Sequence, residues 1–403
     1  MKICYVTLGF APAFELGGPV QNSYQLLRRL VKRGVEVTVC CTNLSGKSTK
    51  SFAGTRRSFI EGIEVIYFDT YKLFPLGIGS FGAYYAPGMK TFCRERLDDY
   101  SLIHMDGYRV VPNMLFSMYA RKKRIPYVIQ ARGTLPADFN SIAAKKVFDV
   151  VFGRKILGNA ACLIASSETE KRQYLGLMPS SEPLVRVIGC GVDVEEYSEI
   201  PDGNSFRSRW DPERKGRKIV SYVGRIHALK GIDHLIRACA RSAYRSDLLL
   251  LIAGPDEGEV RRLRVLADRE GLCEQIRFIG RIDNHEKRQM YAGSDVVVYA
   301  SKSESFGMVA FEAVLCGAPL IVSRDTGCGD LMNHYSAALL VDYGDVQALT
   351  RGIDGILDEP ARHQTKSLNA RDRIIAEMGC DRIAGLYHDV YSEVAENGRK
   401  SGA

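Results

Sequence analysis

Residues 296–315 read VVVYASKSESFGMVAFEAVL, and this stretch decides the fold of the second half of the chain. Its first five residues, Val296–Ala300, form a continuous apolar run, which predicts a buried strand. A helical pattern begins at about Met308, after a short polar turn. A strand that leads through a short turn into a helix is the βα unit of an α/β protein.

Working outward, similar apolar runs alternate with amphipathic helical patterns along nearly the whole chain. This alternation predicts an α/β fold with two Rossmann-like, doubly wound parallel sheets. The predicted strands of the first half are Lys2–Leu8, Glu36–Cys41, Val65–Phe68, Leu102–Met105, Tyr127–Gln130, Cys162–Ala165 and Val185–Ile188. Those of the second half are Ile219–Val223, Leu248–Ala253, Ile276–Ile279, Val296–Ala300, Pro319–Val322 and Ala338–Val341.

The predicted domain boundary lies where polar residues and turn formers replace this alternation. We expect an N-terminal domain over 1–193, a linker over 194–217 and a C-terminal domain over 218–376. A helix over about 377–396 is expected to pack back onto the first domain. Ligands of open α/β sheets bind at the carboxyl ends of the strands, so we expect both sets of ends to line a cleft between the domains.

The composition is that of an ordinary globular protein, with 403 residues of which 46% are hydrophobic and 25% charged. These values exclude a disordered chain, a collagen-like repeat and a small disulfide scaffold. No apolar run approaches the ~18–20 residues that span a bilayer, and the first residues lead into a strand without signal-peptide features. The eleven cysteines form no CxxC pair, which favours a reducing, cytoplasmic compartment.

Positive charge is concentrated in the first half of the chain. Residues 1–193 hold 26 Lys and Arg against 15 Asp and Glu, whereas residues 194–403 hold 29 against 32. We therefore expect the first half to meet an anion or an anionic surface. Nucleic acid is disfavoured as that partner, because the cations are not interleaved with aromatic residues.

One basic segment, Ala144–Leu157, combines clustered cations with Val147, Phe148, Val151 and Phe152. Such a combination is typical of an amphipathic helix on an anionic membrane surface, or beside a lipid-diphosphate acceptor. A core-facing helix with solvated lysines explains the same residues equally well.

The turn after Val296–Ala300 carries residues suited to a phosphorylated sugar. Glu304 lies on the turn, Glu312 lies about one turn inside the helix, and the amides of residues 306–308 are expected to be unpaired at the helix start. Such amides bind anions, and carboxylates accept hydrogen bonds from sugar hydroxyls. The alternative is a capped surface helix with two solvated glutamates.

Two further turns have the same position after a strand. The first reads Gly224-Arg225-Ile226-His227-Ala228-Leu229-Lys230-Gly231, in which Arg225 and Lys230 can converge on one pyrophosphate. Its alternative is a solvent-facing basic turn. In the second, Gly17 and Gly18 precede the first helix and would let the backbone approach a phosphate, although an ordinary βα turn has the same residues. Residues 77–82 spell G-x-G-x-x-G but do not directly follow a strand, so we interpret them as a flexible loop.

Together these three motifs resemble those of the retaining family-4 glycosyltransferases (glycosyl transferases group 1), which have the GT-B fold. The resemblance covers most of the chain and includes Gly317-Ala318-Pro319 before a later strand. It implies that Arg225 and Lys230 hold the donor diphosphate, that Glu312 binds the ribose and that Glu304 contacts the transferred sugar. The implied donor-binding set is completed by Gly17, Gly18, Gly224, Ser305, Phe306, Gly307 and Met308.

The resemblance also implies the reaction. A sugar would pass from a UDP- or GDP-linked donor to a sugar acceptor with its anomeric configuration retained, without a metal or another cofactor. The acceptor is expected to be a lipid-linked glycan in polysaccharide or lipopolysaccharide biosynthesis, at the inner face of the cytoplasmic membrane. Two alternatives stay open: a sugar-nucleotide epimerase or hydrolase of the same fold, and a non-catalytic carbohydrate-binding subunit.

The chain departs from the family pattern in two places, at Arg132 and at Cys190. Arg132 stands where related enzymes often carry a histidine, so it can supply a charge contact to the sugar but cannot act as a base. Cys190 stands where an asparagine is more usual, and Asp193 is interpreted as a structural cap. His104 and Asp106 lie at the end of a predicted strand, where they are expected to face the acceptor side of the cleft or to serve as satisfied structural groups.

Overall fold

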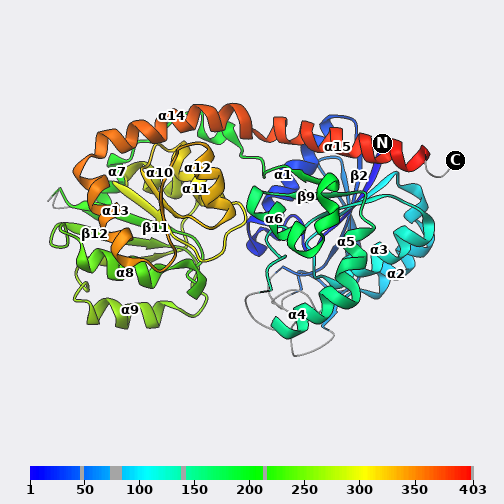
Figure 1. The fold of residues 1–403 in the computed structure, drawn as a ribbon, viewed down its shortest axis with the longest axis horizontal. Helices are drawn as coiled ribbons and strands as arrows, with labels where there is room; N and C mark the ends of the chain where they lie inside the picture. The colour runs from blue at the N-terminus through cyan, green and yellow to red at the C-terminus, as the bar shows by residue number, and fades with distance from the viewer. Residues whose placement is uncertain (46–49, 73–83, 138–141, 212–215, 401–403) are drawn as a thin grey trace. The chain divides into compact units, whose positions relative to one another are not determined.

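The computed structural model describes residues 1–45, 50–72, 84–137, 142–211 and 216–400 (Figure 1). The glycine-rich motif at 77–82 lies outside these residues.

The chain divides into two compact units. The first comprises Met1–Gly191 and Cys380–Ala403, and the second comprises Val192–Gly379. Each unit contains one large sheet with helices on both sides, as the alternation of strand and helix patterns predicts.

The first unit has an eight-stranded sheet in the order β10-β9-β8-β7-β1-β2-β4-β3. All neighbours are parallel except β3 and β4. The strands are β1 (Lys2–Val6), β2 (Glu36–Thr42), β3 (Arg56–Ile60), β4 (Ile63–Phe68), β7 (Leu102–Asp106), β8 (Tyr127–Gln130), β9 (Cys162–Ala165) and β10 (Val185–Val187). A separate antiparallel pair joins β5 (Tyr71–Lys72) to β6 (Tyr84–Tyr85).

Helices cover both faces of this sheet. They are α1 (Gly18–Lys32), α2 (Pro87–Glu95), α3 (Val111–Lys123), α4 (Ile142–Phe148), α5 (Arg154–Gly158), α6 (Glu168–Leu177) and α15 (Cys380–Lys400). Short helical turns are η1 (Phe14–Leu16), η2 (Leu97–Asp99), η4 (Pro179–Leu184) and the π-helical η3 (Asp149–Gly153). Side chains alternate along each strand, so Ile103 and Met105 enter the core cluster under α2 and α3, whereas His104 points to the opposite face.

The C-terminal helix α15 packs against α1 within the first unit. The guanidinium of Arg33, the C-cap residue of α1, donates to the carbonyl oxygen of Asp381 at 2.8 Å. The helical pattern expected over about 377–396 therefore spans the end of one helix and most of another, because α14 ends at Met378 and α15 begins at Cys380.

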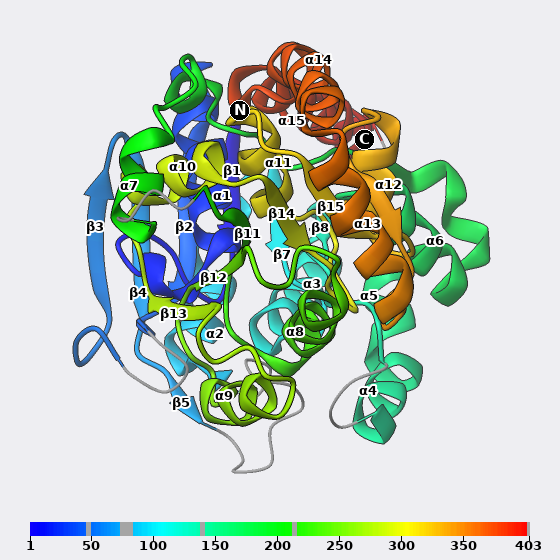
Figure 2. The same cartoon turned by 90° about the vertical axis from the view of Figure 1, so that its left-hand side faces the viewer.

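The second unit has a six-stranded, fully parallel sheet in the order β13-β12-β11-β14-β15-β16 (Figure 2). The strands are β11 (Lys218–Val223), β12 (Leu248–Ala253), β13 (Ile276–Gly280), β14 (Val296–Tyr299), β15 (Leu320–Ser323) and β16 (Leu339–Val341). The helices are α7 (Asn204–Trp210), α8 (Ile232–Arg241), α9 (Val260–Arg269), α10 (Asn284–Gly293), α11 (Met308–Leu315), α12 (Gly327–His334), α13 (Val346–Asp358) and α14 (Pro360–Met378), with η5 (Val194–Tyr197) and η6 (Ala228–Lys230) as short turns.

The segment expected to be a linker, 194–217, belongs to the second unit where it is described. It forms η5 and α7, and α7 packs against α10. Arg209 on α7 forms an ion pair with Glu286 on α10 at 2.6 Å, and Arg207 forms one with Asp295 at 2.5 Å. Asp193 stands at the N-cap position of η5, as expected of a structural cap, although its side chain makes no capping hydrogen bond.

Within the part of the chain that the structure describes, no helix is both long enough and apolar enough to cross a bilayer.

Candidate functional site

The predicted donor-binding turns meet at the switch point of the second sheet. Strand order runs outward from β11 in one direction and from β14 in the other, and these two strands are neighbours. The turn 224–231 follows β11, and the turn 300–307 follows β14. Ligands of doubly wound sheets bind at such a point, outside the carboxyl ends of the strands.

Lys230 and Glu304 meet across this switch point. The Nζ atom of Lys230 lies 2.8 Å from Oε2 of Glu304, and both side chains are largely buried, at 10% and 19% exposure. The hydroxyl of Tyr299, the last residue of β14, donates to the same carboxylate oxygen at 2.6 Å and lies 3.1 Å from Nζ of Lys230. A buried cation, a carboxylate and a phenol therefore share one centre.

This centre keeps the Glu304 carboxylate ionised. Burial by itself would raise the pKa of Glu304, but the charge of Lys230 and the hydrogen bonds from Lys230 and Tyr299 outweigh burial, so the pKa lies below its usual value. Arg225 lowers the pKa of Glu304 further through its charge, which places that cation near the same centre. Burial and the charge of Glu304 raise the pKa of Tyr299, so the phenol remains a hydrogen-bond donor.

Arg225 is the exposed cation of the group. Its side chain is 58% exposed, and its Nη1 atom contacts both carboxylate oxygens of Glu257 at 3.0 and 3.1 Å. Its carbonyl oxygen accepts a hydrogen bond from the hydroxyl of Tyr222 at 2.9 Å, which fixes the backbone of the turn. Tyr222 also stacks on Tyr299, with ring centroids 6.3 Å apart, so two tyrosines support both turns.

The start of α11 lies on the turn that carries Glu304. Gly307 occupies the N-cap position with a left-handed φ of 81°, and no side chain of the described chain caps the helix. A Cβ atom at Gly307 would lie 2.5 Å from the sulfur of Cys328, so both the backbone angle and the packing require glycine. The Phe306 ring stacks on Phe311 at 4.6 Å, which leaves its backbone rather than its side chain for a ligand. Uncapped amides at a helix start suit an anion.

Glu312 lies in the second turn of α11, with a side chain 13% exposed. Its partners come from α10: Nζ of Lys287 lies 2.8 Å from Oε1, and the hydroxyl of Tyr291 donates to Oε2 at 3.0 Å. Glu312 lies five positions after Gly307, a rise of about 7.5 Å along the helix axis. Within the described chain, its carboxylate contacts α10 rather than Arg225 or Lys230.

In the first unit, Gly17 and Gly18 form the start of α1. Gly17 is the N-cap residue with a φ of 103°, and Pro19 follows in the first turn. No described atom lies within 4 Å of the position that a Cβ atom would take at either glycine. The backbone is therefore open to a ligand at this helix start.

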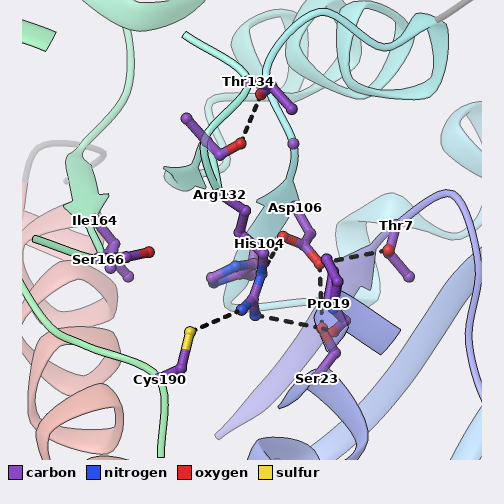
Figure 3. Close-up of polar contacts among 12 residues, drawn as sticks. Thr7, Pro19, Ser23, His104, Asp106, Arg132, Thr134, Ile164, Ser166 and Cys190 are labelled. Carbon is purple, nitrogen blue, oxygen red and sulfur yellow. Dashed lines mark hydrogen bonds and ion pairs between the residues drawn. The ribbon is translucent and has the colours of Figure 1, made fainter. Parts of the chain in front are cut away.

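Arg132 differs from the expectation, because its guanidinium points into the first unit (Figure 3). Nε donates to Oδ1 of Asp106 at 2.5 Å, and the two side chains are only 8% and 5% exposed. Nη2 lies 3.3 Å from Oγ of Ser23 and 3.2 Å from the hydroxyl of Tyr5, and Nη1 lies 3.6 Å from Sγ of Cys190. The expected contacts of Arg132 with a sugar and of Asp106 with an acceptor are therefore corrected: the two residues form a buried ion pair.

His104 is also inside the first unit, and the expectation that it faces an acceptor is wrong. Its side chain has no exposed surface, and its ring stacks on Tyr5 at 4.5 Å. Nδ1 is 2.7 Å from the hydroxyl of Tyr391 on α15, so His104 helps to fasten the C-terminal helix. Burial, assisted by the nearby charge of Arg132, holds the pKa of His104 well below its usual value, so the ring is neutral.

Several residues at these centres were not identified from the sequence. Tyr299 is the last strand residue before the turn that carries Glu304, and Tyr222 lies three residues before Arg225. Their position next to the motifs is the sequence feature that could have identified them. Lys287 and Tyr291 are four residues apart and share one helix face, a spacing common to many surface helices. Among the described residues, no group of three or more His, Cys, Asp or Glu side chains is arranged to hold a metal ion.

Two parallel α/β units, with loops at the switch point of each sheet, define a GT-B protein. Two family models match the chain in succession: the glycosyl transferase 4-like domain over residues 17–191 and glycosyl transferases group 1 over residues 205–373. The chain belongs to the group 1, family-4 glycosyltransferases.

Curated relatives carry similar names. The D-inositol 3-phosphate glycosyltransferase of Corynebacterium jeikeium is 29% identical over 273 residues, which is 63% of this chain and 63% of that protein. An uncharacterized glycosyltransferase of Methanocaldococcus jannaschii is 24% identical over 98% of this chain and 99% of its own length.

Solved structures share the fold over nearly the whole chain. HepE of Anabaena, in complex with UDP and glucose, matches with a TM-score of 0.75 at 20% identity, covering 98% of this chain and 100% of HepE. Sucrose-phosphate synthase of Thermosynechococcus elongatus matches with a TM-score of 0.74 at 24% identity, covering 97% and 98%.

Proposed function

We propose that this protein is a retaining glycosyltransferase that moves a sugar from a UDP- or GDP-linked donor to a glycan acceptor. The observation that carries the proposal is the pairing of Lys230 with Glu304 beside Arg225, at the switch point of the second sheet. Family membership supports the reaction class, and the UDP bound in HepE supports a uridine nucleotide as the first donor to test.

The chemistry follows from the charges at this centre. As the bond between sugar and diphosphate breaks, negative charge grows on the departing phosphate, and preorganised cations stabilise that charge. Arg225 and Lys230 are the proposed cations, assisted by the amides of residues 306–308 at the start of α11. We propose that they take the place of a metal ion, and that no other cofactor is needed.

Two carboxylates would orient the donor. Glu304 is ionised and fixed by Lys230 and Tyr299, so it can accept hydrogen bonds from hydroxyls of the transferred sugar. Glu312, fixed by Lys287 and Tyr291 farther along α11, would accept from the ribose hydroxyls. Gly17 and Gly18 would lie against the diphosphate, because the backbone over them is open.

For the acceptor we propose a lipid-linked glycan used in cell-surface polysaccharide or lipopolysaccharide assembly at the inner face of the cytoplasmic membrane. The excess of positive charge in residues 1–193 supports an anionic acceptor or surface. WaaG, a structural neighbour with a TM-score of 0.69, is a glycosyltransferase involved in lipopolysaccharide biosynthesis, and the C. jeikeium relative is named for D-inositol 3-phosphate.

A donor panel tests the proposal. UDP-, GDP- and ADP-sugars are compared in a thermal-shift assay, and nucleotide release is then measured with and without a lipid extract. We expect one nucleotide sugar to raise the melting temperature and release to need the extract. Release at full rate from donor alone would indicate the alternative epimerase or hydrolase, and binding without any turnover would indicate a non-catalytic subunit.

Three variants test the site. Arg225→Ala, Lys230→Ala and Glu304→Ala are each expected to lose most activity while folding normally. Arg261→Ala serves as the matched control, because Arg261 is an exposed cation on α9 of the same unit. Activity at the level of the control in all three variants would refute the site assignment.

A further inference from the structure

The segment from α4 to the start of α5 exposes an unusual number of large apolar side chains. Of the sixteen large apolar side chains exposed in the described residues, five lie between positions 142 and 152. We call them the α4–α5 apolar surface: Ile142 (45% exposed), Val147 (62%), Val150 (68%), Val151 (56%) and Phe152 (45%). An exposed apolar cluster of this kind marks a binding surface more often than a solvated one.

The charges that point outward from the same segment are positive. Lys146, Arg154 and Lys155 are exposed, and Lys145 is half-buried beside them. The one acidic residue of the segment, Asp149, is buried and forms an ion pair with Arg109. An apolar surface flanked by cations without exposed carboxylates is complementary to an anionic lipid surface.

The inner side of the segment is firmly attached to the first unit, so its exposure does not come from loose packing. Arg109 contacts both oxygens of Asp149, at 2.9 and 2.6 Å, and also donates to the carbonyls of Thr134 and Leu135 at 2.5 and 2.8 Å. The ring of Phe148 packs edge-on against Tyr108 at 5.8 Å. These contacts hold the inner face while the apolar surface remains uncovered.

Three successive apolar residues face outward in the π-helical turn η3. The turn Asp149–Gly153 is wound more widely than an α-helix. With Asp149 and Gly153 turned inward at its two ends, Val150, Val151 and Phe152 lie together on the outer side.

We propose that the α4–α5 apolar surface and its cations dock the protein on an anionic membrane, the apolar side chains entering the interface and the cations meeting lipid headgroups. The proposal rests on the proposed function in one respect: a lipid-linked acceptor has to be reached at a bilayer. A second copy on the same surface would set the cations against their own equivalents across a two-fold axis, which disfavours a dimer. A protein partner is also disfavoured, because lysine is depleted from the cores of protein interfaces.

Vesicle flotation with the full chain tests the proposal. Vesicles of phosphatidylcholine alone are compared with vesicles that contain phosphatidylglycerol, at low and high salt and without any sugar donor. We expect the wild-type protein to float more with the anionic vesicles than with phosphatidylcholine alone, and less at high salt. Equal flotation with both kinds of vesicle, or with neither, would overturn the proposal.

Two variants divide the surface into its parts. Lys146→Ser/Arg154→Ser/Lys155→Ser is expected to weaken partition to anionic vesicles by about 100-fold, since each cation near such a surface contributes about a fivefold factor. Val150→Ser/Val151→Ser/Phe152→Ser is expected to abolish flotation at high salt, where the apolar contribution remains. The matched control is Phe59→Ser/Met118→Ser, which removes two apolar side chains, 72% and 58% exposed, elsewhere on the same unit.

The outcomes separate this proposal from the proposed function. Each variant is expected to keep the melting temperature and the donor-induced thermal shift of the wild type. These two measurements report on folding and on donor binding, respectively. Loss of flotation in the control, wild-type partition in both surface variants, or a dimeric mass that the apolar variant abolishes would overturn membrane docking. None of these results would bear on the proposed donor site, which the donor-induced thermal shift, nucleotide release and the three site variants test separately.

Discussion

The hydroxyl of Tyr299 is the most direct probe of the proposed donor site, because Tyr299→Phe removes one oxygen and little else. That oxygen donates to Glu304 at 2.6 Å and lies 3.1 Å from Nζ of Lys230. The phenylalanine ring keeps the stacking on Tyr222 and the position 5.2 Å from the Lys230 ammonium. The ion pair between Lys230 and Glu304 also remains, so the fold should survive.

The magnitude follows from the hydrogen bond that is lost. A hydrogen bond to a charged group contributes ~1.5–3 kcal/mol. Because Lys230 still holds the carboxylate, we expect the lower end of this range, which corresponds to about a tenfold loss of kcat/KM. Tyr299 would then act as a positioning residue, working through Glu304 rather than touching the sugar.

The pH profile distinguishes positioning from a general structural defect. Glu304 has a lowered pKa partly because the Tyr299 hydroxyl stabilises its ionised form. Removing that donor raises the pKa of Glu304, so the acid limb of kcat/KM should move to higher pH. The control is Tyr222→Phe, which loses a bond to the neutral carbonyl of Arg225 and should leave the limb in place. An unmoved limb in Tyr299→Phe, or an equal move in the control, would refute the reasoning.

Two further predictions concern the interior of the first unit. Arg132→Met is expected to lower the free energy of unfolding by ~3–5 kcal/mol, because it leaves the Asp106 carboxylate buried and unpaired. In urea titrations, the double variant Arg132→Met/Asp106→Leu should recover much of this loss. A single variant as stable as the wild type would contradict the buried pair. The pKa of His104 in the folded protein lies far below its unfolded value of about 6.5, so below that pH the unfolded chain takes up a proton that the folded protein does not. The free energy of unfolding should therefore fall as pH drops below about 6.5, by up to ~1.4 kcal/mol per pH unit. This pH dependence should be smaller in His104→Phe, and an identical slope in both proteins would show that another group is responsible.

Buried parallel strands were predictable from the sequence because their whole length is apolar. Leu248–Ala253 and Cys162–Ala165 are found as predicted, since both are covered on both faces. The strand β3 was missed for the converse reason. It reads Arg-Arg-Ser-Phe-Ile, lies at the sheet edge with mostly exposed side chains and pairs antiparallel to β4, so it lacks an apolar run.

The motifs located the two turns that follow β11 and β14, because each motif comes directly after an apolar strand run. The direction of Arg132 could not be predicted in the same way. It depends on a left-handed backbone angle of 50° and on Asp106, which lies on a different strand. The burial of His104 depends on Tyr391, 287 residues away, and no local pattern encodes that contact. The position of the turns was thus predictable from local sequence, whereas the orientation of Arg132 and His104 depends on packing between residues far apart in the chain.

The two cations of the proposed donor site are already paired, and the strength of each pair decides how a diphosphate would displace it. In the pair of Arg225 with Glu257 the guanidinium is 58% exposed and the carboxylate 14% exposed, so water can solvate Arg225 when it leaves Glu257. Lys230 and Glu304 are mostly buried, and separating a buried pair costs ~3–5 kcal/mol. Under the proposed function, Lys230 would therefore stay with Glu304 and meet the phosphate from a fixed position. Arg225 would exchange its carboxylate for the diphosphate and close on the donor as it binds.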